Sequence, residues 1–443
     1  MLAPESLSDE LEGIARRAQA NGRLPSLNAC VFRRGEVIWE RALGLADVGA
    51  GIDATPDTQY RVASITKTFI AASVLQLRDA GELDLDDPLS RHLPDAPHGW
   101  LTLRRLLSHM SGLQRELPGT MWETLEFPAT EQLLERAADA DAVLSPGERW
   151  HYSNLAYTLL GHVISARCGM GAQEYVDRRL LGPLGVARTT WSVQAPSARP
   201  YFVEPFSDTV LDEPSIDLAG TAAAGGLWST TADLARWGGF LADPDPAVLD
   251  PATVEQMHVV QGLAEADWSL GWGLGICLFR RGDRILAGHT GGLPGFVSIF
   301  LYDRAERTGA VALTNSSVWP KLTETGLDLA FAALDHFAAR PETWRPSDAP
   351  PPEIESLLGR WWSEAREWTF SFRDGRLEAR LESAPEGVVA GFESTGEDVF
   401  RTTSGLETGE ELRVVRDEAG VPVTLYWATY PFRREPGVFG SAG

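Results

Sequence analysis

The sequence predicts an α/β (α+β) protein: an antiparallel sheet flanked by helices, an all-helical subdomain, and a small all-β barrel or sandwich at the C-terminal end. Three observations predict this class. Strand-type runs joined by short turns fill residues 271–314, which is typical of an antiparallel sheet. Residues 82–180 carry helical periodicity with few strand signals, and residues 354–443 alternate apolar and polar side chains. A chain of 443 residues has room for two or three domains.

Before residue 185 the expected elements follow the apolar spacing and the turn residues. The run that starts at residue 64 predicts a helix that ends near Gly81, because glycine accepts the left-handed conformation of a C-terminal cap. In chain order we expect a helix over residues 5–20, strands over 29–32 and 37–39, the helix from residue 64, and helices over 131–140 and 155–166.

Residues 185–222 show no clear periodicity, and loops of this length inside compact domains are usually functional or mobile. The aromatic residues of this stretch either form a pocket wall or pin the loop to the body of the domain. They are Trp191, Tyr201, Phe202 and Phe206. The elements expected after it are a helix over residues 232–240, strands over 271–279, 284–287, 295–302 and 309–314, and a closing helix over 322–338.

Five prolines between residues 340 and 353 predict a linker. We therefore expect one domain over residues 1–339, with the helical subdomain at about 82–180, and an all-β domain over 354–443. A lipocalin-like barrel is one form that the second domain can take. Its strands are expected over residues 368–372, 377–381, 396–402, 411–416 and 423–430.

Composition narrows the possible partners. The net charge of −23 (39 Lys and Arg against 62 Asp and Glu) argues against nucleic acid and anionic membranes. The three cysteines are too scattered for a disulfide framework or a zinc site, so no metal or other cofactor is expected. No run approaches the roughly 18 apolar residues of a membrane span. The first 22 residues lack the apolar core of a secretory signal, so we expect a cytoplasmic protein.

Ser64 stands three residues before Lys67 at the start of its predicted helix. Residues i and i+3 share a helix face, so the hydroxyl and the amine can meet. Only two of the 39 basic residues are lysine, Lys67 and Lys321. Lysine can lose its proton when it is buried, whereas arginine cannot. Lys67 is therefore a candidate base that activates Ser64 as a nucleophile, and a chance match on a helix surface is the alternative.

Two further motifs complete the candidate site. They are Tyr152-Ser153-Asn154, expected on a turn, and His289-Thr290-Gly291-Gly292, expected at the end of a strand. Acyl transfer needs a nucleophile, a route for its proton, and donors for the oxyanion. Tyr152 is expected to act as a phenolate base and then as an acid, with a neighbouring cation lowering its pKa.

The remaining residues of these motifs are assigned to binding. Asn154 is expected to orient Lys67 and a substrate amide. The backbone N–H groups of Ser64 and Gly292 are candidate oxyanion donors. Small residues at Gly291 and Gly292 would let a substrate lie along the strand beside Thr290.

In this order and spacing, the three motifs resemble the class C β-lactamase and serine-type D-peptidase/esterase superfamily, the penicillin-recognising serine hydrolases. The runs over residues 101–113, 146–154, 224–230 and 288–295 resemble it as well, and the likeness covers about residues 10–338. The resemblance implies a β-lactamase/transpeptidase-like fold. It also implies that Ser64 is acylated, that Lys67 and Tyr152 act as its base pair, and that Gly292 donates to the oxyanion.

One position departs from that family pattern. Lactamase members usually carry lysine where this chain has His289, and that lysine is taken to anchor the substrate carboxylate. Histidine is a weaker, pH-dependent cation, so weak β-lactamase activity at most is expected. Esterases and peptidases of the superfamily resemble the histidine form. A purely structural imidazole is the other interpretation of His289.

The leading hypothesis is a serine hydrolase that cleaves a carboxylic ester or a D-amino-acid peptide through an acyl-enzyme on Ser64. A transacylase would use the same residues with another acceptor. A non-catalytic ligand-binding or sensor protein is the alternative of another class, which the presence of Lys67 and Tyr152 disfavours. The expected partner is a small-molecule or short-peptide acyl substrate, and the oligomeric state is left open.

Overall fold

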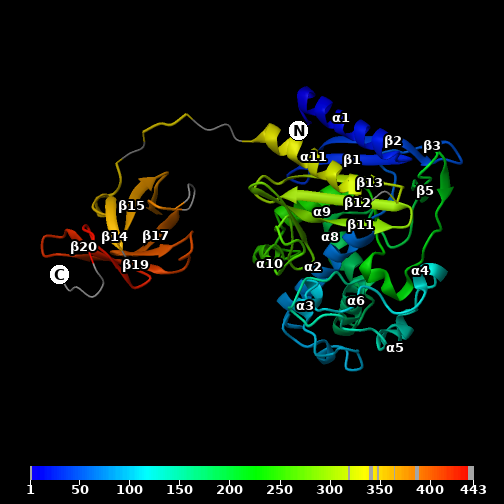
Figure 1. Cartoon of the computed structure of the whole chain (residues 1–443), viewed down its shortest axis with the longest axis horizontal. Helices are drawn as coiled ribbons and strands as arrows, with labels where there is room; N and C mark the ends of the chain where they lie inside the picture. Colours follow the sequence, from blue (N-terminus) through cyan, green and yellow to red (C-terminus); the bar gives the residue numbers. More distant parts are fainter. Residues whose placement is uncertain are drawn as a thin grey trace. The chain divides into compact units, whose positions relative to one another are not determined.

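The structure, a computed structural model, describes residues 2–317, 320–338, 343–346, 349–363, 365–384 and 389–437. Its contacts divide the chain into two compact units, Met1–Ala339 and Arg340–Gly443, which are drawn in Figure 1 and described separately below. Of the predicted linker over 340–353, residues 340–342, 347 and 348 lie outside the described residues. No helix in the described parts combines the length and apolarity needed to cross a membrane.

The first unit is built on an antiparallel sheet that joins the two ends of its sequence. Within the described residues the strand order is β3-β2-β1-β13-β12-β11-β10-β9-β8. The N-terminal hairpin enters the sheet because β1 pairs with β13, with Leu27 opposite Thr314. The strands are β1 (Ser26–Arg33), β2 (Glu36–Asp47), β3 (Ile52–Asp53), β8 (Gly262–Leu263), β9 (Leu270–Trp272), β10 (Cys277–Arg281), β11 (Arg284–Leu293), β12 (Phe296–Asp303) and β13 (Thr308–Thr314).

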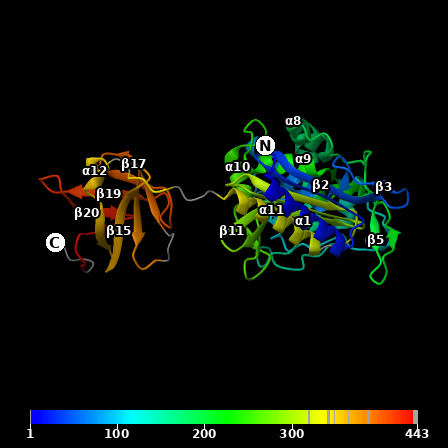
Figure 2. The same ribbon diagram turned by 90° about the horizontal axis from the view of Figure 1, so that it is seen from above.

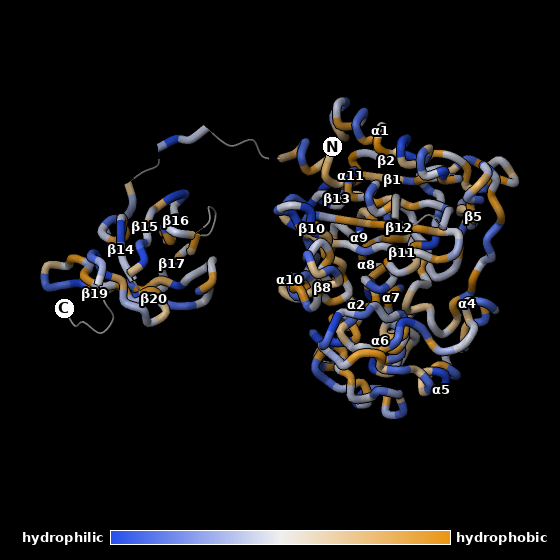
Figure 3. Tube along the Cα trace, viewed as in Figure 1, coloured by the Kyte–Doolittle hydropathy of each residue, from blue (hydrophilic) through white to orange (hydrophobic). Residues whose placement is uncertain are grey.

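Helices α1 (Glu5–Gly22) and α11 (Pro320–Phe337) lie side by side on one face of this sheet, as Figures 1 and 2 show. Alternation along β1 explains the arrangement. Ala29 and Val31 pack toward α1 and α11, whereas Phe32 packs into the core on the opposite face. The central strands are apolar on both faces, and Figure 3 shows the run of hydrophobic residues along β12.

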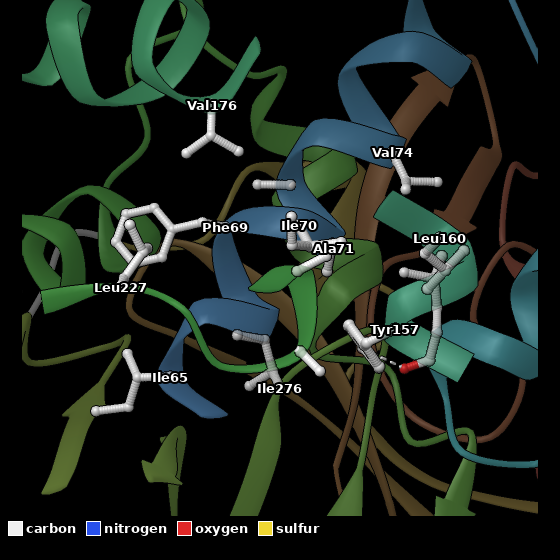
Figure 4. Close-up of a cluster of buried hydrophobic side chains, with 14 of the residues drawn as sticks. Ile65, Phe69, Ile70, Ala71, Val74, Tyr157, Leu160, Val176, Leu227 and Ile276 are labelled. Atoms are coloured by element: carbon white, nitrogen blue, oxygen red, sulfur yellow. Dashed lines mark hydrogen bonds between the residues drawn. The ribbon is translucent and has the colours of Figure 1, made fainter. Parts of the chain in front are cut away.

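The opposite face is covered by α9 (Thr231–Ala242). Side chains of α2 (Thr66–Asp79) contact Trp237 of α9. The ring of Phe69 stacks on that of Trp237 with 4.0 Å between centroids, and the indole of Trp237 donates to Thr68 Oγ1 at 2.9 Å. Figure 4 shows the apolar side chains that surround α2. Ile65, Leu160, Val176, Leu227 and Ile276 pack around Ile70 and Val74 of α2 itself. Because α2 is buried along most of its length, the residues at its N-terminal end are held rigidly.

The helical subdomain is present, and one of its helices is shorter than the sequence predicts. A helix was expected over residues 131–140, but the chain forms a 3₁₀ turn at Thr130–Gln132 and a helix only at Leu133–Ala137. Leu133 and Ala137 are the buried residues of that helix, so its apolar face is a single turn long. The other helices before the long loop are α3 (Leu103–Leu107), α4 (Met121–Thr124), α6 (Asn154–Cys168), α7 (Ala172–Val176) and α8 (Gly182–Leu184).

The strand expected over residues 271–279 is divided into β9 and β10. Gly275 lies between them with φ +78°, and a side chain there would place its Cβ 2.3 Å from that of Ala71. The segment therefore bends toward α2 instead of continuing as a strand. The loop over residues 185–222 contains the hairpin β5 (Tyr201–Val203) and β6 (Val210–Asp212). Short elements elsewhere are β4 (Tyr60–Arg61), which pairs with β7 (Trp228–Ser229), and α10 (Pro251–Met257).

The second unit is a barrel rather than a sandwich. Strands β14 to β21 follow one another in an antiparallel order, and Trp362 exchanges backbone hydrogen bonds with Arg433 to join the first strand to the last. Aromatic side chains such as Trp361, Phe370 and Trp427 fill the interior. The lipocalin-like form stays a prediction. The elements are α12 (Pro352–Glu355), β14 (Gly359–Ser363), β15 (Arg366–Arg373), β16 (Arg376–Leu381), β17 (Ala390–Gly396), β18 (Val399–Thr402), β19 (Glu411–Arg416), β20 (Pro422–Trp427) and β21 (Tyr430–Phe432).

One expected strand of this unit is wrong in its bounds. The strand predicted over residues 396–402 is divided by a turn at residues 397–398 into the end of β17 and the whole of β18. Asp398 adopts φ +57° in this turn, a conformation that ends a strand.

Candidate active site

A cavity of about 1140 Å³ lies in the first unit and brings together residues from all three motifs. Most of its lining is apolar and much of that is aromatic. The motif residues in the lining are Ser64, Tyr152, Asn154, Thr290 and Gly292. The aromatic residues are Trp122, Phe127, Trp150, Phe202, Trp272, Phe279 and Phe296.

Ser64 lies in a 3₁₀ turn, Ala63–Ile65, directly before α2. The preceding Ala63 has φ +47°, an uncommon conformation for a residue with a side chain, and such conformations cluster at functional sites. The chain before it is fixed from two sides: Val62 N donates to Leu227 O at 3.0 Å, and Ser298 Oγ donates to Val62 O at 2.9 Å. The hydroxyl therefore has a rigid support.

Lys67 is fully buried, and its Nζ donates to three oxygen atoms. They are Ser64 Oγ at 3.0 Å, Asn154 Oδ1 at 2.7 Å and Ala224 O at 2.6 Å. Burial lowers the pKa of Lys67 from 10.5 to about 7, with Glu116 opposing this shift and Arg115 reinforcing it. Near neutral pH the amine is thus charged in some molecules and neutral in others.

Tyr152 also contacts Ser64, through a hydrogen bond between the two side chains. Two cations face its ring: Lys67 Nζ lies 5.0 Å and Arg115 Cζ lies 4.9 Å from the ring centroid. The expected lowering of the pKa of Tyr152 is nevertheless wrong. Burial raises its pKa above the usual value, and the hydrogen bond from Ser64 and the charge on Arg115 offset only part of that rise. The phenol is therefore protonated in the resting site.

Asn154, the first residue of α6, connects Lys67 to an acidic residue. Its Oδ1 accepts from Lys67, and its Nδ2 donates to Glu116 Oε1 at 2.5 Å. The contact with Lys67 is present, and the orienting role of Asn154 stays a prediction. Sequence reasoning missed Glu116, whose pKa is raised by burial. No spacing signal marks this residue, because it reaches the site from a loop.

The third motif lies inside β11 rather than at the end of a strand. Alternation along the strand divides its residues between two faces, so Thr290 and Gly292 line the cavity. Gly291 instead packs behind Ser64, where a Cβ atom would lie 2.0 Å from Val62 O. Glycine at 291 is thus required by packing against the segment before Ser64, rather than by space for a substrate.

The expectation that His289 supplies a weak cation to the site is not supported. Its side chain is 1% exposed and is absent from the cavity lining. Nδ1 donates to Thr290 O at 2.5 Å. Burial, together with the charge of Lys67, lowers the pKa of His289 to about 3. The imidazole is therefore neutral, which favours the structural interpretation.

His109 is a second residue that sequence reasoning passed over. It holds the turn that carries Tyr152 in three ways. His109 O accepts from His151 N at 2.8 Å, its Nδ1 accepts from Ser153 N at 3.0 Å, and its ring stacks on Tyr152 with 4.3 Å between centroids. Its place in the run over residues 101–113 was the signal that could have found it.

Three of the four aromatic residues of the long loop take one of the two expected roles. Phe202 lines the cavity. Tyr201 and Trp191 pin the loop, since the Tyr201 hydroxyl accepts from Val48 N at 2.9 Å and Trp191 Nε1 donates to Asp177 at 3.0 Å. Phe206 is 99% exposed. Nowhere in the described chain do three or more His, Cys, Asp or Glu residues gather in a way that could hold a metal ion.

A sheet flanked by helices, with a serine, a buried lysine and a tyrosine meeting beside it, defines the serine β-lactamase-like superfamily. Residues 11–335 match the Beta-lactamase family, and the chain belongs to this family. Residues 350–434 match a Domain of unknown function, DUF7586.

Comparison with known proteins adds three relatives. Protein flp of Staphylococcus aureus (strain MW2) is 26% identical over 330 residues, which cover 71% of this chain and 65% of that protein's length. The crystal structure of SurE is 27% identical with a TM-score of 0.64, covering 97% of this chain and 99% of SurE. A D-amino acid amidase from Ochrobactrum anthropi SV3, complexed with D-phenylalanine, is 25% identical with a TM-score of 0.67, covering 75% of this chain and all (100%) of the amidase. The SurE match extends over both units.

Proposed function

We propose that the protein is a serine hydrolase that cleaves an ester or an amide through an acyl-enzyme on Ser64. The hydrogen bonding of Lys67 is the observation that carries this proposal. Two of its three partners, Asn154 Oδ1 and Ala224 O, are carbonyl oxygens and can only accept. A neutral amine has two N–H groups, so both are taken by these oxygens and the lone pair is left facing Ser64 Oγ.

The proposed reaction follows from this geometry. Ser64 Oγ bonds to the substrate carbonyl carbon while its proton passes to Lys67 Nζ. The backbone N–H groups of Ser64 and Gly292 stabilise the oxyanion. As the bond to the leaving group breaks, Tyr152 gives its phenolic proton to that group and is reprotonated from Lys67. Water then replaces the leaving group, transfers one proton back through the same groups, and frees the acid and Ser64.

The substrate class follows from the cavity and from the relatives. The apolar, aromatic lining suits an acyl group with a bulky apolar side chain. The amidase that matches at 25% identity acts on D-amino acid derivatives by its name, which favours a D-amino-acid amide or peptide over a simple carboxylic ester. Because His289, at the position where lactamase members carry lysine, is neutral and buried, the third motif supplies no cation and β-lactam hydrolysis is expected to be weak.

A transacylase remains the second candidate, since it would use the same residues and differ only in the acceptor. A non-catalytic binding protein would not need the lysine geometry described above. The test is labelling with a fluorophosphonate probe together with turnover of a p-nitrophenyl ester, in the wild type and in Ser64→Ala. Labelling and turnover that both vanish in the variant are expected. Their absence from the wild type would refute the proposal. Turnover of matched D- and L-amino-acid amides and of nitrocefin then distinguishes amide hydrolysis, its stereochemical preference, and β-lactam hydrolysis.

A further inference from the structure

Arg115 supplies an unusual charge to the cavity. Among the described residues that line it, Arg115 is the only lysine, arginine or histidine. Arg115 is exposed, and its guanidinium lies over the ring of Tyr152, at 4.9 Å from Cζ to the centroid. The chain has 62 acidic residues that could pair with an arginine, yet Arg115 lies over an aromatic face instead. Its N–H donors therefore remain available for a ligand.

The two acidic residues of the cavity, Glu116 and Glu213, form no ion pair with Arg115 within the described residues, although the charges of Glu116 and Arg115 interact at longer range. Glu116 accepts from Asn154 Nδ2, and Glu213 accepts from Ser317 Oγ at 3.3 Å. The third motif offers no competing cation, because His289 is neutral and buried. Arg115 is therefore the positive group that an anionic part of a substrate would meet.

The position of Arg115 indicates which part of the substrate that would be. Arg115 O accepts from Asn154 N at 2.8 Å and from Leu155 N at 3.2 Å, which fixes the arginine to the turn that carries Tyr152. Tyr152 is the group that protonates the leaving group in the proposed mechanism, and its hydroxyl bonds to Ser64. A guanidinium held beside the same phenol lies on the leaving-group side of Ser64.

We propose that Arg115 binds a carboxylate carried by the leaving group, so that preferred substrates release a hydroxy acid or an amino acid rather than a neutral alcohol or ammonia. The planar guanidinium can hold a carboxylate through two parallel hydrogen bonds, which also orients the leaving atom toward Tyr152. This inference rests on the proposed function and specifies the substrate class of the same site.

The test compares two esters that differ only at the leaving group: phenylacetyl glycolate, which carries a carboxylate, and phenylacetyl glycolamide, which is neutral. Each is measured with the wild type, Arg115→Gln, Arg115→Lys and the control Arg280→Gln. Arg280 also lies over an aromatic ring, at 4.8 Å from that of Trp268, and does not line the cavity. p-Nitrophenyl phenylacetate serves as the internal standard, because its leaving group has no carboxylate.

The wild type should favour the glycolate ester by about 10- to 100-fold in kcat/KM, the range expected for a hydrogen-bonded charge pair. Arg115→Gln should lose that preference, measured as the ratio of the two kcat/KM values, because this ratio cancels the effect that the lost Arg115 charge has on Lys67 and Tyr152. Arg115→Lys should keep part of the preference. Arg280→Gln should behave as the wild type. Equal turnover of the two esters by the wild type, or an equal loss on all three substrates in Arg115→Gln, would overturn this inference alone. No turnover of the p-nitrophenyl ester by the wild type would overturn the proposed function and this inference with it.

Discussion

Replacing Lys67 by arginine keeps a positive charge at the site but removes the proton acceptor. With a pKa of about 7, the amine is neutral in about half of the molecules at pH 7. A lysine at its ordinary value would be neutral in only about 3 in 10,000, so burial raises the supply of the base about 10³-fold. An arginine is neutral in fewer than about one molecule in 100,000 at that pH.

The expected loss for Lys67→Arg is about 10³- to 10⁴-fold in the rate of acylation, because general-base catalysis contributes about 10²- to 10⁴-fold and the geometry also suffers. The three oxygens at 2.6–3.0 Å surround a tetrahedral nitrogen and leave no room for a planar guanidinium. Stopped-flow measurement of p-nitrophenol release in a single turnover reports this step directly.

The pH dependence gives a second readout. Because the reactive form of Lys67 is neutral, wild-type acylation should fall as pH drops through about 7 and level off above it. Lys67→Arg should lose this acidic limb. Circular dichroism and thermal unfolding control for misfolding, and Lys67→Gln, which carries no charge, separates a lost base from a buried unpaired cation. Acylation by Lys67→Arg within tenfold of the wild type, or a flat wild-type profile between pH 5 and 9, would refute the base role.

Three more predictions concern the surroundings of this lysine. Tyr152→Phe should lower kcat by at least about 100-fold with little change in KM, because only proton transfer to the leaving group is lost; an unchanged kcat would contradict the relay. His109→Phe keeps a ring against Tyr152 but removes the acceptor for Ser153 N, so kcat should fall about tenfold, and His109→Asn should recover part of it. Wild-type activity in His109→Phe together with a loss in His109→Asn would show that the ring alone matters. Removal of residues 354–443 should leave p-nitrophenyl ester turnover intact, and its complete loss in a truncated chain that still shows cooperative unfolding would mean that the barrel supplies part of the site.

Short-range patterns in the sequence predicted most elements of the first unit, because apolar periodicity reflects which face of an element is buried. The spacing of Ser64 and Lys67 placed both in one site for the same reason: three residues along a helix is a fixed distance. Where the local signal was ambiguous, tertiary contacts decided the outcome. Gly275 interrupts the strand with φ +78°, and its approach to Ala71 of α2, which leaves no room for a side chain, is visible only in three dimensions.

The parts of the site that the sequence did not predict depend on burial and on loops. A neighbouring cation was expected to lower the pKa of Tyr152, but desolvation outweighs the charge of Arg115 there. His289 alternates with Thr290 along β11, and that alternation turns the imidazole away from the cavity. Glu116 and Arg115 come from a loop whose path has no periodicity, so their meeting with Asn154 became visible only in three dimensions.

The final strand of the barrel has a consequence for handling the protein. Arg433 and Trp362 complete the ring of backbone pairs. Proteolytic cleavage before Tyr430 would remove β21 and leave β14 and β20 with unpaired edges. Exposed edges of this kind recruit strands from other molecules. Preparations nicked near the C-terminal end should therefore precipitate or form higher-order species, whereas tags fused beyond residue 437 leave the ring complete.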